Sequence, residues 1–454
     1  MGCSMLGVFL ALAVAIGPEA ASPEDSALVS RLGSTRYVER ESAEAALIGR
    51  GRAALPALRA ATGHRDLEVR VRVGAILRQV ERSLVLQPTP ILLDFRDAPL
   101  ADVLRRVDER SDLHLAVAAR DSAWSGRKVT LEDPAPLPFW SAIDRLREAG
   151  RLSYTLVAPP EPGQRDGSFV FQDEPALLPE FVSDSGPFRS QLASIAYQSE
   201  MSLSRPRPAA AGSDNASSGG GAGAARPNRQ MYLQLLVAAE PRLAITQDGP
   251  VRLLEAVDER GQSLVPTETS TMLSRSSGYF GMNPTPQVRL RVDLSRPEEP
   301  GRRIARIRGS VPVMVSARMP EPLVVPLAEP LGRVHRNADA TLVVRAIRAA
   351  RGDQPAAVEL TLRGDPGQEP PDDERADHAF AKTDVPRQQL EVLDARGNPL
   401  AWFPSATQYS SDETRLTLTV PAQGAPGLPA TIRYHGIVRI PTEVAFEFRD
   451  VPMP

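Results

Sequence analysis

The chain has very little cysteine and lysine. Cys3 is its only cysteine, and a mature chain that loses its first residues has no disulfide, no thiolate nucleophile and no cysteine metal site. Lys128 and Lys382 are the only lysines, and with abundant alanine, proline and glycine this preference for arginine indicates a genome-composition bias rather than phosphate recognition. A net charge of −3 provides no overall field that would hold nucleic acid or an anionic membrane.

Long apolar runs are missing beyond the first residues. The run from Leu6 to Ile16 is too short to span a bilayer comfortably, and Gly17-Pro18 and the small residues Ala20-Ala21-Ser22 follow it. We therefore predict a signal peptide over residues 1–22 that is cleaved on export, which makes the mature chain periplasmic or secreted. No integral membrane segment is expected in the mature chain, and lipidation is not expected because Cys3 comes before the apolar run rather than after it.

Recognisable catalytic and metal-binding motifs are also missing. The sequence contains no phosphate loop and no G-x-S-x-G elbow, and its histidines show neither the HExxH spacing nor another metal-ligand interval: His64, His114, His335, His378 and His435. We predict no catalytic, cofactor-binding or metal site. Two alternatives stay open: a pair of carboxylates brought together from separate strands for glycoside hydrolysis, and weak calcium binding by the acidic loop at residues 364–386.

Residues 23–86 have a helical pattern throughout. Apolar residues recur at helical spacing over 41–48, 53–61 and 67–80, and Pro56 stands near the start of the second of these helices. The block from Leu55 to Val80 resembles a HEAT repeat, with one helix, a short Gly/Asp turn and a second helix that opens with Glu-Val-Arg. Because about one and a half units are present, we expect a short helical pair or bundle rather than an extended solenoid.

The stretch from Ile91 to Val157 predicts a small α/β module. Ile91, Leu93 and Phe95 alternate as in a strand, and an amphipathic helix with Leu100, Val103, Leu104 and Val107 on one side follows. A second strand-helix-strand unit then repeats the scheme, with Trp140 beside the apolar stripe of its helix and Gly150 as the expected C-cap. The order of elements favours a split βαβ arrangement.

The phrase LLDFRDAPLADVLRRVDERSDLHLAV, followed by KVTLED, resembles the short N-terminal domain shared by bacterial secretins and TonB-dependent transducers. The resemblance implies a periplasmic domain over residues 87–176 that docks onto other proteins, and it supplies no catalytic residue. Nothing downstream resembles a secretin pore or an outer-membrane barrel, so the transport roles of that family are not implied. Arg96 and Asp97 within the phrase, together with Trp124 in the turn between the two halves, are the candidate contact residues.

The C-terminal half contains an internal repeat. Leu254–Leu264 and Leu390–Leu400 both read as a strand, an Asp-x-Arg-Gly turn and a second strand, and flanking strands match in the same order. We predict two copies of one all-β sandwich at residues 186–330 and 331–454, the first with a flexible loop at 205–229 and the second with the acidic loop. Gly261 and Gly397 occupy turn positions that favour positive φ.

The predicted fold class is therefore multidomain: a small all-α lead, a split βαβ module and two duplicated all-β sandwiches. The modular build and the lack of catalytic motifs favour a non-enzymatic interaction or scaffold protein of the bacterial cell envelope, with an unidentified envelope protein as partner and no nucleic acid. One alternative is an enzyme or binding protein for envelope polysaccharide, for which the tryptophans could stack on sugar rings. Another is a structural component of the cell surface that assembles through sheet edges.

Overall fold

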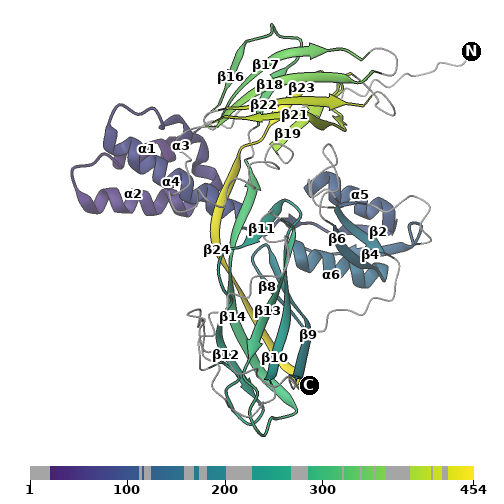
Figure 1. Cartoon of the computed structure of the whole chain (residues 1–454). Coiled ribbons are helices and arrows are strands. Elements are labelled where there is room, and N and C mark those ends of the chain that lie inside the picture. Colours follow the sequence, from purple (N-terminus) through teal and green to yellow (C-terminus); the bar gives the residue numbers. More distant parts are fainter. Residues whose placement is uncertain are drawn as a thin grey trace, which may run out of the picture. The chain divides into compact units, whose positions relative to one another are not determined.

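The computed structural model divides the chain into two compact units, Met1–Gln87 and Pro88–Pro454 (Figure 1). The structure describes residues 21–111, 115–116, 124–157, 168–172, 181–200, 228–266, 285–319, 322–337, 340–350, 354–364, 389–410, 413–421 and 428–454. The predicted signal peptide up to residue 20, nearly all of the 205–229 loop and the acidic loop beyond Gly364 lie outside the described residues. In the described part, no helix has the length and apolar character needed to cross a membrane.

The first unit is helical, as predicted. It contains α1 (Pro23–Arg31), α2 (Tyr37–Arg50), a 3-10 turn (Gly51–Ala54), α3 (Leu55–Ala60) and α4 (Leu67–Val85). Ser22 and Asp66 cap α1 and α4 by accepting hydrogen bonds from the backbone N–H of the second residue of each helix, Glu24 and Glu68. One apolar core holds the four helices together, and its fully buried members include Leu32, Leu47, Leu58, Val73 and Ile76.

The second unit begins with an α/β module, residues 90–172. Its elements are β1 (Pro90–Ile91), β2 (Asp94–Pro99), α5 (Leu100–Ser111), β3 (Leu115–Ala116), β4 (Lys128–Glu132), β5 (Leu137–Pro138), α6 (Phe139–Gly150), β6 (Ser153–Val157) and β7 (Ser168–Gln172). The strands form a β1–β5 pair, a β2–β4 pair and a sheet in the order β3-β7-β6, in which β3 and β7 are parallel. The predicted stripe of α5 is confirmed, because Leu100, Val103, Leu104 and Val107 are all buried.

Gly150 ends α6, but for a different reason than expected. The left-handed residue after the helix is Arg151, at φ +52°, rather than a glycine. A Cβ on Gly150 would lie 2.8 Å from Leu100 Cδ2, so the absent side chain lets the end of α6 approach the start of α5. The glycine leaves room for the Leu100 side chain, and its φ is outside the left-handed region.

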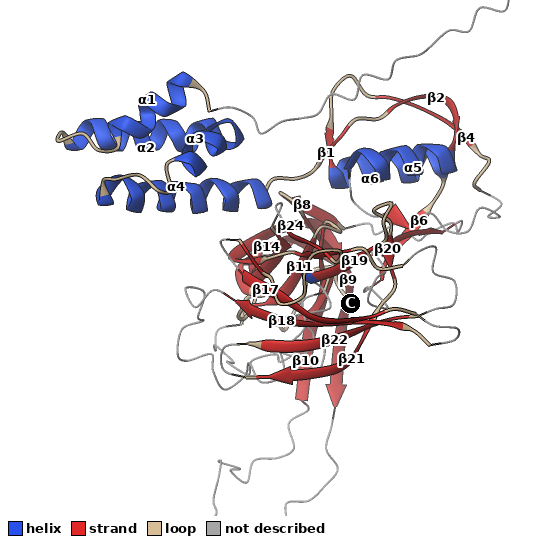
Figure 2. Cartoon of the chain, turned by 90° about the horizontal axis from the view of Figure 1, so that it is seen from above, coloured by secondary structure: helices blue, strands red, loops and turns tan. Residues whose placement is uncertain are grey.

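The rest of the chain is built from strands (Figure 2). In the first β group, β8 (Val182–Ser185), β9 (Phe188–Glu200), β10 (Asn228–Ala239) and β13 (Gln287–Leu294) form one sheet in the order β13-β10-β9-β8. A second sheet is centred on β14 (Arg303–Arg318), which pairs with β11 (Leu243–Gln247), β12 (Arg252–Asp258) and β24 (Ile437–Pro452).

The second β group also has two sheets. One has the order β15-β23-β19-β20, from β15 (Leu323–Pro326), β23 (Thr431–Tyr434), β19 (Leu390–Leu393) and β20 (Pro399–Leu400). The other has the order β16-β17-β18-β22-β21, from β16 (Val334–Arg336), β17 (Ala340–Arg348), β18 (Ala356–Gly364), β22 (Thr414–Val420) and β21 (Phe403–Tyr409). Buried residues of both sheets share one core, including Val325, Leu342, Leu360, Trp402 and Ile432.

The expected boundary at 330/331 does not follow the sheets. β15, which lies in the first predicted copy, pairs with β23 of the second β group. β24, which ends the second predicted copy, pairs instead with β14 of the first β group from Arg303↔Pro452 to Arg318↔Ile437. Each predicted copy therefore places its last strand in the other group. Strand order along the chain cannot reveal this, because pairing between distant strands is decided by tertiary packing.

The two Asp-x-Arg-Gly turns have the same hydrogen-bond pattern. Asp258 Oδ1 accepts from the backbone N–H groups of Arg260 and Gln262, at 2.9 and 2.8 Å, and Asp394 Oδ1 accepts from those of Arg396 and Asn398, at 2.8 Å each. The glycines that follow adopt φ +78° at Gly261 and +83° at Gly397, which confirms the sequence expectation.

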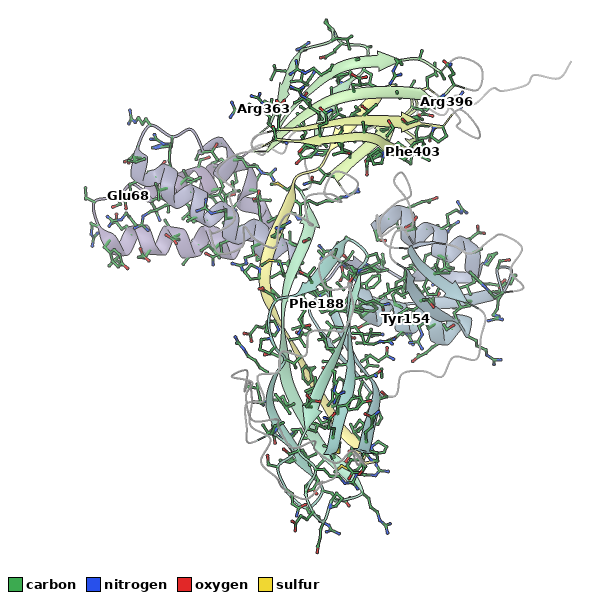
Figure 3. The ribbon with its side chains drawn as sticks, viewed as in Figure 1. Glu68, Tyr154, Phe188, Arg363, Arg396 and Phe403 are labelled. Atoms are coloured by element: carbon green, nitrogen blue, oxygen red, sulfur yellow. The ribbon has the colours of Figure 1, made fainter. Side chains whose placement is uncertain are left out.

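The place of β24 leads to a first testable expectation. Phe446 on β24 is 2% exposed and packs over Gly309 of β14, so Phe446→Ala should lower the free energy of unfolding by about 3–5 kcal/mol. Because β24 completes the first β group, amide exchange should accelerate in β12 and β14. The matched control is Phe403→Ala on β21, whose side chain is 46% exposed and should cost less than about 1 kcal/mol (Figure 3). Faster exchange in β17 and β18 instead would contradict this view.

Candidate functional site

A buried arginine joins the α/β module to the first β group. Arg189 lies on β9 and its side chain is 3% exposed. Its guanidinium donates to Asp184 through Nε and Nη2, both at 2.8 Å, and to Asp144 of α6 through Nη1 at 2.8 Å and Nη2 at 2.6 Å. The same group lies over the ring of Trp140, 4.8 Å from its centroid. One cation thus holds two carboxylates from different elements in a geometry typical of strong Arg–carboxylate pairing.

Burial alone would lower the pKa of Arg189, but its hydrogen bonds to the carboxylates of Asp184 and Asp144 outweigh burial and raise that pKa above its ordinary value. The guanidinium therefore stays charged at every accessible pH. Its charge is balanced by two carboxylates, so the arginine acts as a structural bridge and not as a free anion site.

A second polar contact joins the same two parts. Glu240, the residue after β10, is fully buried. It accepts from the N–H of Thr89, the residue before β1, at 2.9 Å and from the Thr89 hydroxyl at 2.6 Å. Arg242 Nε donates to Glu240 Oε2 at 2.9 Å, which supplies the counter-charge. The Trp140 indole N–H donates to the Pro187 carbonyl at 3.1 Å, and Ala238 of β10 belongs to the apolar core of the module. The module is therefore packed onto β9 and β10 through both polar and apolar contacts.

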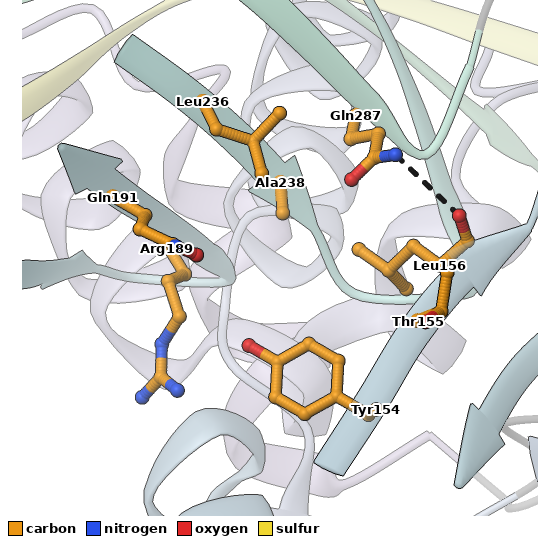
Figure 4. A pocket seen from close by; sticks show the side chains of 8 residues that line it. All are labelled: Tyr154, Thr155, Leu156, Arg189, Gln191, Leu236, Ala238 and Gln287. Carbon is orange, nitrogen blue, oxygen red and sulfur yellow. Dashed lines mark hydrogen bonds between the residues drawn. The ribbon is translucent and has the colours of Figure 1, made fainter. Parts of the chain in front are cut away.

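Beside this joint lies a small cleft of about 190 Å³ (Figure 4). Three consecutive residues of β6, Tyr154 to Leu156, form one side, and side chains from β9, β10 and β13 form the other. Gln287 Nε2 donates across it to the Leu156 carbonyl at 3.4 Å. Burial raises the pKa of Tyr154 although the adjacent Arg189 opposes the shift, so the phenol remains a neutral donor.

The expectation that Trp124 is an exposed contact residue is wrong, because its side chain is 2% exposed and belongs to the module core. The turn that carries it binds the start of α5: the Leu100 N–H donates to the Arg127 carbonyl at 2.8 Å and the Ala101 N–H to the Ser125 carbonyl at 3.1 Å. By satisfying the free N–H groups of the helix, the turn draws the indole inward. The expectation that Trp140 is a core residue is confirmed at 1% exposure.

Arg96 and Asp97 are at the surface, with side chains 82% and 73% exposed. They occupy a β-bulge, since the register between β2 and β4 shifts between Phe95 and Ala98. Asp97 has φ +44°, which is unusual for a residue other than glycine. Arg96 pairs with Glu132 and Asp97 with Lys128, so four charged side chains lie on one exposed ribbon.

Two of the histidines contact carboxylates. His435 Nε2 lies 3.3 Å from Glu391 Oε2, and Arg318 Nη1 lies 2.7 Å from Glu391 Oε1. His435 lowers the pKa of Glu391 most, burial opposes it and Arg318 lowers it further, to about 2. His335 similarly lies 3.3 Å from Glu329. Among the residues that the structure describes, no group of three or more His, Cys, Asp or Glu side chains could hold a metal ion.

Comparison of the chain with protein-family models, with curated proteins and with solved structures finds no match. The joint residues Arg189 and Glu240 were not singled out by sequence reasoning. Arg189 directly follows Phe188 at the start of β9, and Glu240 directly follows the apolar end of β10. A charged residue next to apolar strand residues is the one local signal that could have drawn attention to them.

Replacing Arg189 tests the joint. Arg189→Met leaves Asp184 without its cation and leaves Asp144 with Arg147 alone, whose Nη1 lies 3.0 Å from Asp144 Oδ1. We expect a loss of about 2–4 kcal/mol in the free energy of unfolding, measured by denaturant titration. The carboxylates are each 38% exposed, which keeps the loss below that of a fully buried pair. Arg105→Met is the control, since its pair with Asp102 at 2.7 Å has side chains that are 56% and 47% exposed and should contribute less than about 1 kcal/mol. Equal losses from both variants would contradict the structural role of Arg189.

The low pKa of Glu391 makes stability depend on pH. The pKa of Glu391 falls from an ordinary value of 4.5 to about 2 in the folded chain. The ionised carboxylate therefore contributes stability that is complete above pH 4.5 and is lost as the pH falls towards 2. Glu391→Gln should cost about 1–3 kcal/mol at pH 7. The difference from the unmodified chain should shrink below pH 4.5 in thermal unfolding. Glu359→Gln, which removes a surface partner 3.9 Å from Arg348, serves as the control; a Glu391→Gln deficit that is constant with pH would rule out this origin.

Proposed function

We propose that the chain is an exported, non-enzymatic scaffold of the bacterial cell envelope that binds another envelope protein through its α/β module. The observation that supports this most is the exposed, charged bulge at Arg96 and Asp97. These residues also lie in the phrase that resembles the docking domain of secretins and TonB-dependent transducers. The apolar run and small residues over 1–22 support export.

The bulge combines backbone strain with exposure. A non-glycine residue in the left-handed region costs on the order of 1 kcal/mol, and such positions persist where the surroundings fix them. Here the Asp97 N–H donates to Thr130 Oγ1 at 3.2 Å and the carboxylate pairs with Lys128, so both contacts come from β4. The Asp97 carboxylate is exposed and does not contribute to the core, so the backbone strain at this position has no role in folding that would account for it. Strained residues of this kind cluster at binding and active sites, which supports a contact role for Asp97.

The polysaccharide alternative is less well supported. All three tryptophans are buried, with Trp124 and Trp402 at 2% and Trp140 at 1% exposure, so none presents a ring face to a sugar. Assembly through sheet edges remains an alternative for the β groups, and the concentration dependence of the oligomeric state would test it.

We also infer that the two β groups arose by duplication. The strand order β13-β10-β9-β8 corresponds to β22-β18-β17-β16, and the register shifts in the equivalent pairs β9–β10 and β17–β18. The identical Asp-x-Arg-Gly turns support the same inference. Both groups then serve as spacers or walls that carry the contact module.

Asp97→Gly separates contact from stability. Glycine adopts φ +44° without strain, so we expect the free energy of unfolding to stay constant or rise by up to about 1 kcal/mol. Chemical crosslinking in envelope fractions should nevertheless lose its main partner, most clearly with Arg96→Ala added. Asp102→Ala on α5 is the control, because it removes a carboxylate that is 47% exposed outside the bulge. An unchanged set of crosslinked proteins in the double variant would refute this function for the bulge.

A further inference from the structure

The cleft beside β6 runs along the last strand of a sheet. In the sheet β3-β7-β6, β6 is the last strand, and within the described residues it pairs with β7 alone. An edge strand offers backbone N–H and C=O groups that can bind another extended chain. The three consecutive residues Tyr154 to Leu156 line the cleft, so the cleft follows the strand rather than a single side chain.

The contact from Gln287 shows which backbone groups point into the cleft. Its Nε2 reaches the Leu156 carbonyl, which therefore faces away from β7. In an antiparallel pair, successive residues direct their backbone groups alternately towards and away from the partner strand. The N–H and C=O of Tyr154 and the N–H of Leu156 consequently face the cleft as well, while those of Thr155 face β7.

The opposite wall is the face of the neighbouring sheet. Arg189 and Gln191 alternate on β9, and Leu236 and Ala238 alternate on β10, so all four side chains extend from the same face (Figure 4). The charge of Arg189 is balanced by Asp144 and Asp184, which leaves a wall of apolar groups and neutral amides. Such a wall suits uncharged side chains and disfavours an isolated charge.

We propose that this cleft binds an extended segment of a partner protein, which lies alongside β6 as an additional strand and places a small uncharged side chain between β6 and the face of β9 and β10. The proposal rests on the proposed function and names its peptide-binding site. The segment displaces the 3.4 Å contact from Gln287 to the Leu156 carbonyl and forms main-chain hydrogen bonds to Tyr154 and Leu156, which provide the affinity. The side chains of β9 and β10 provide the selection of side chains in the segment. The Tyr154 hydroxyl, beside Arg189, is a further donor for a carbonyl of the segment.

The test uses a library of heptapeptides displayed on phage and selected against the full chain. We expect enrichment of sequences with uncharged residues at alternate positions, and at least tenfold weaker binding of those peptides to Leu236→Lys, which places an ammonium in the cleft. Leu254→Lys is the matched control, because that side chain is 62% exposed on β12. If Leu236→Lys does not fold, Gln287→Arg at the half-buried end of the cleft replaces it.

Amide exchange supplies a readout that a purely structural role would not change. A bound peptide should slow exchange at Tyr154 and Leu156 at least tenfold and leave Thr155 unchanged, since its N–H already pairs with β7. Selected peptides that bind Leu236→Lys as tightly as the unmodified chain, or that leave the Tyr154 and Leu156 amides unaffected, would overturn the proposal. If Leu236→Lys keeps the crosslinked partner that Asp97→Gly loses, the cleft proposal fails while the proposed function stands. If neither variant loses a partner, both fail.

Discussion

The pairing of β24 with β14 is the constraint on which the β-rich part depends. Gly309 of β14 has no room for a side chain, because a Cβ there would lie 2.5 Å from the Arg252 carbonyl and 2.6 Å from the ring of Phe446. β24, the last strand, thus packs closely against strands whose residues come more than a hundred positions earlier in the sequence. Since β15 passes in the opposite direction into the second β group, neither group contains all of its strands without the other. Contacts of such long sequence separation also predict slow folding.

The α/β module depends on the first β group in a comparable way. The guanidinium of Arg189 and the carboxylate of Glu240 are both withdrawn from water, and each has partners on both sides of the joint. Arg189 donates to Asp144 of the module and to Asp184 of β8, and Glu240 accepts from Thr89 and from Arg242. Removing the module would take Asp144 away from Arg189 and Thr89 away from Glu240. It would also expose Ala238, which packs in the core of the module. The module is better regarded as a part fixed to β9 and β10 than as a domain on a tether.

The sequence allowed prediction of what is local. The stripe of α5, the helices of the first unit and the positive φ at Gly261 and Gly397 all follow from patterns within a few residues. The exchange of β15 and β24, the Arg189 joint and the cleft beside β6 could not be predicted, because each depends on which distant strands pair. Trp124 is a smaller example of the same problem. The sequence predicts that its turn is exposed, but the carbonyls of the turn accept hydrogen bonds from the first N–H groups of α5, and the turn therefore packs against the helix with the indole buried.

A fixed module changes what a contact at Asp97 can do. When a partner binds a domain on a flexible tether, the tether loses conformational entropy, and this loss weakens binding. A module that Arg189 and Glu240 already hold in place loses little further entropy. The bulge lies on β2 and β4, whose buried residues Phe95 and Leu131 belong to the same core as Ala238 of β10. A partner at the bulge therefore contacts a surface that is continuous, through packed side chains, with the sheet that β9 and β10 form. Stiffness of this kind suits a scaffold, because it fixes where a bound partner sits relative to the strands beneath it.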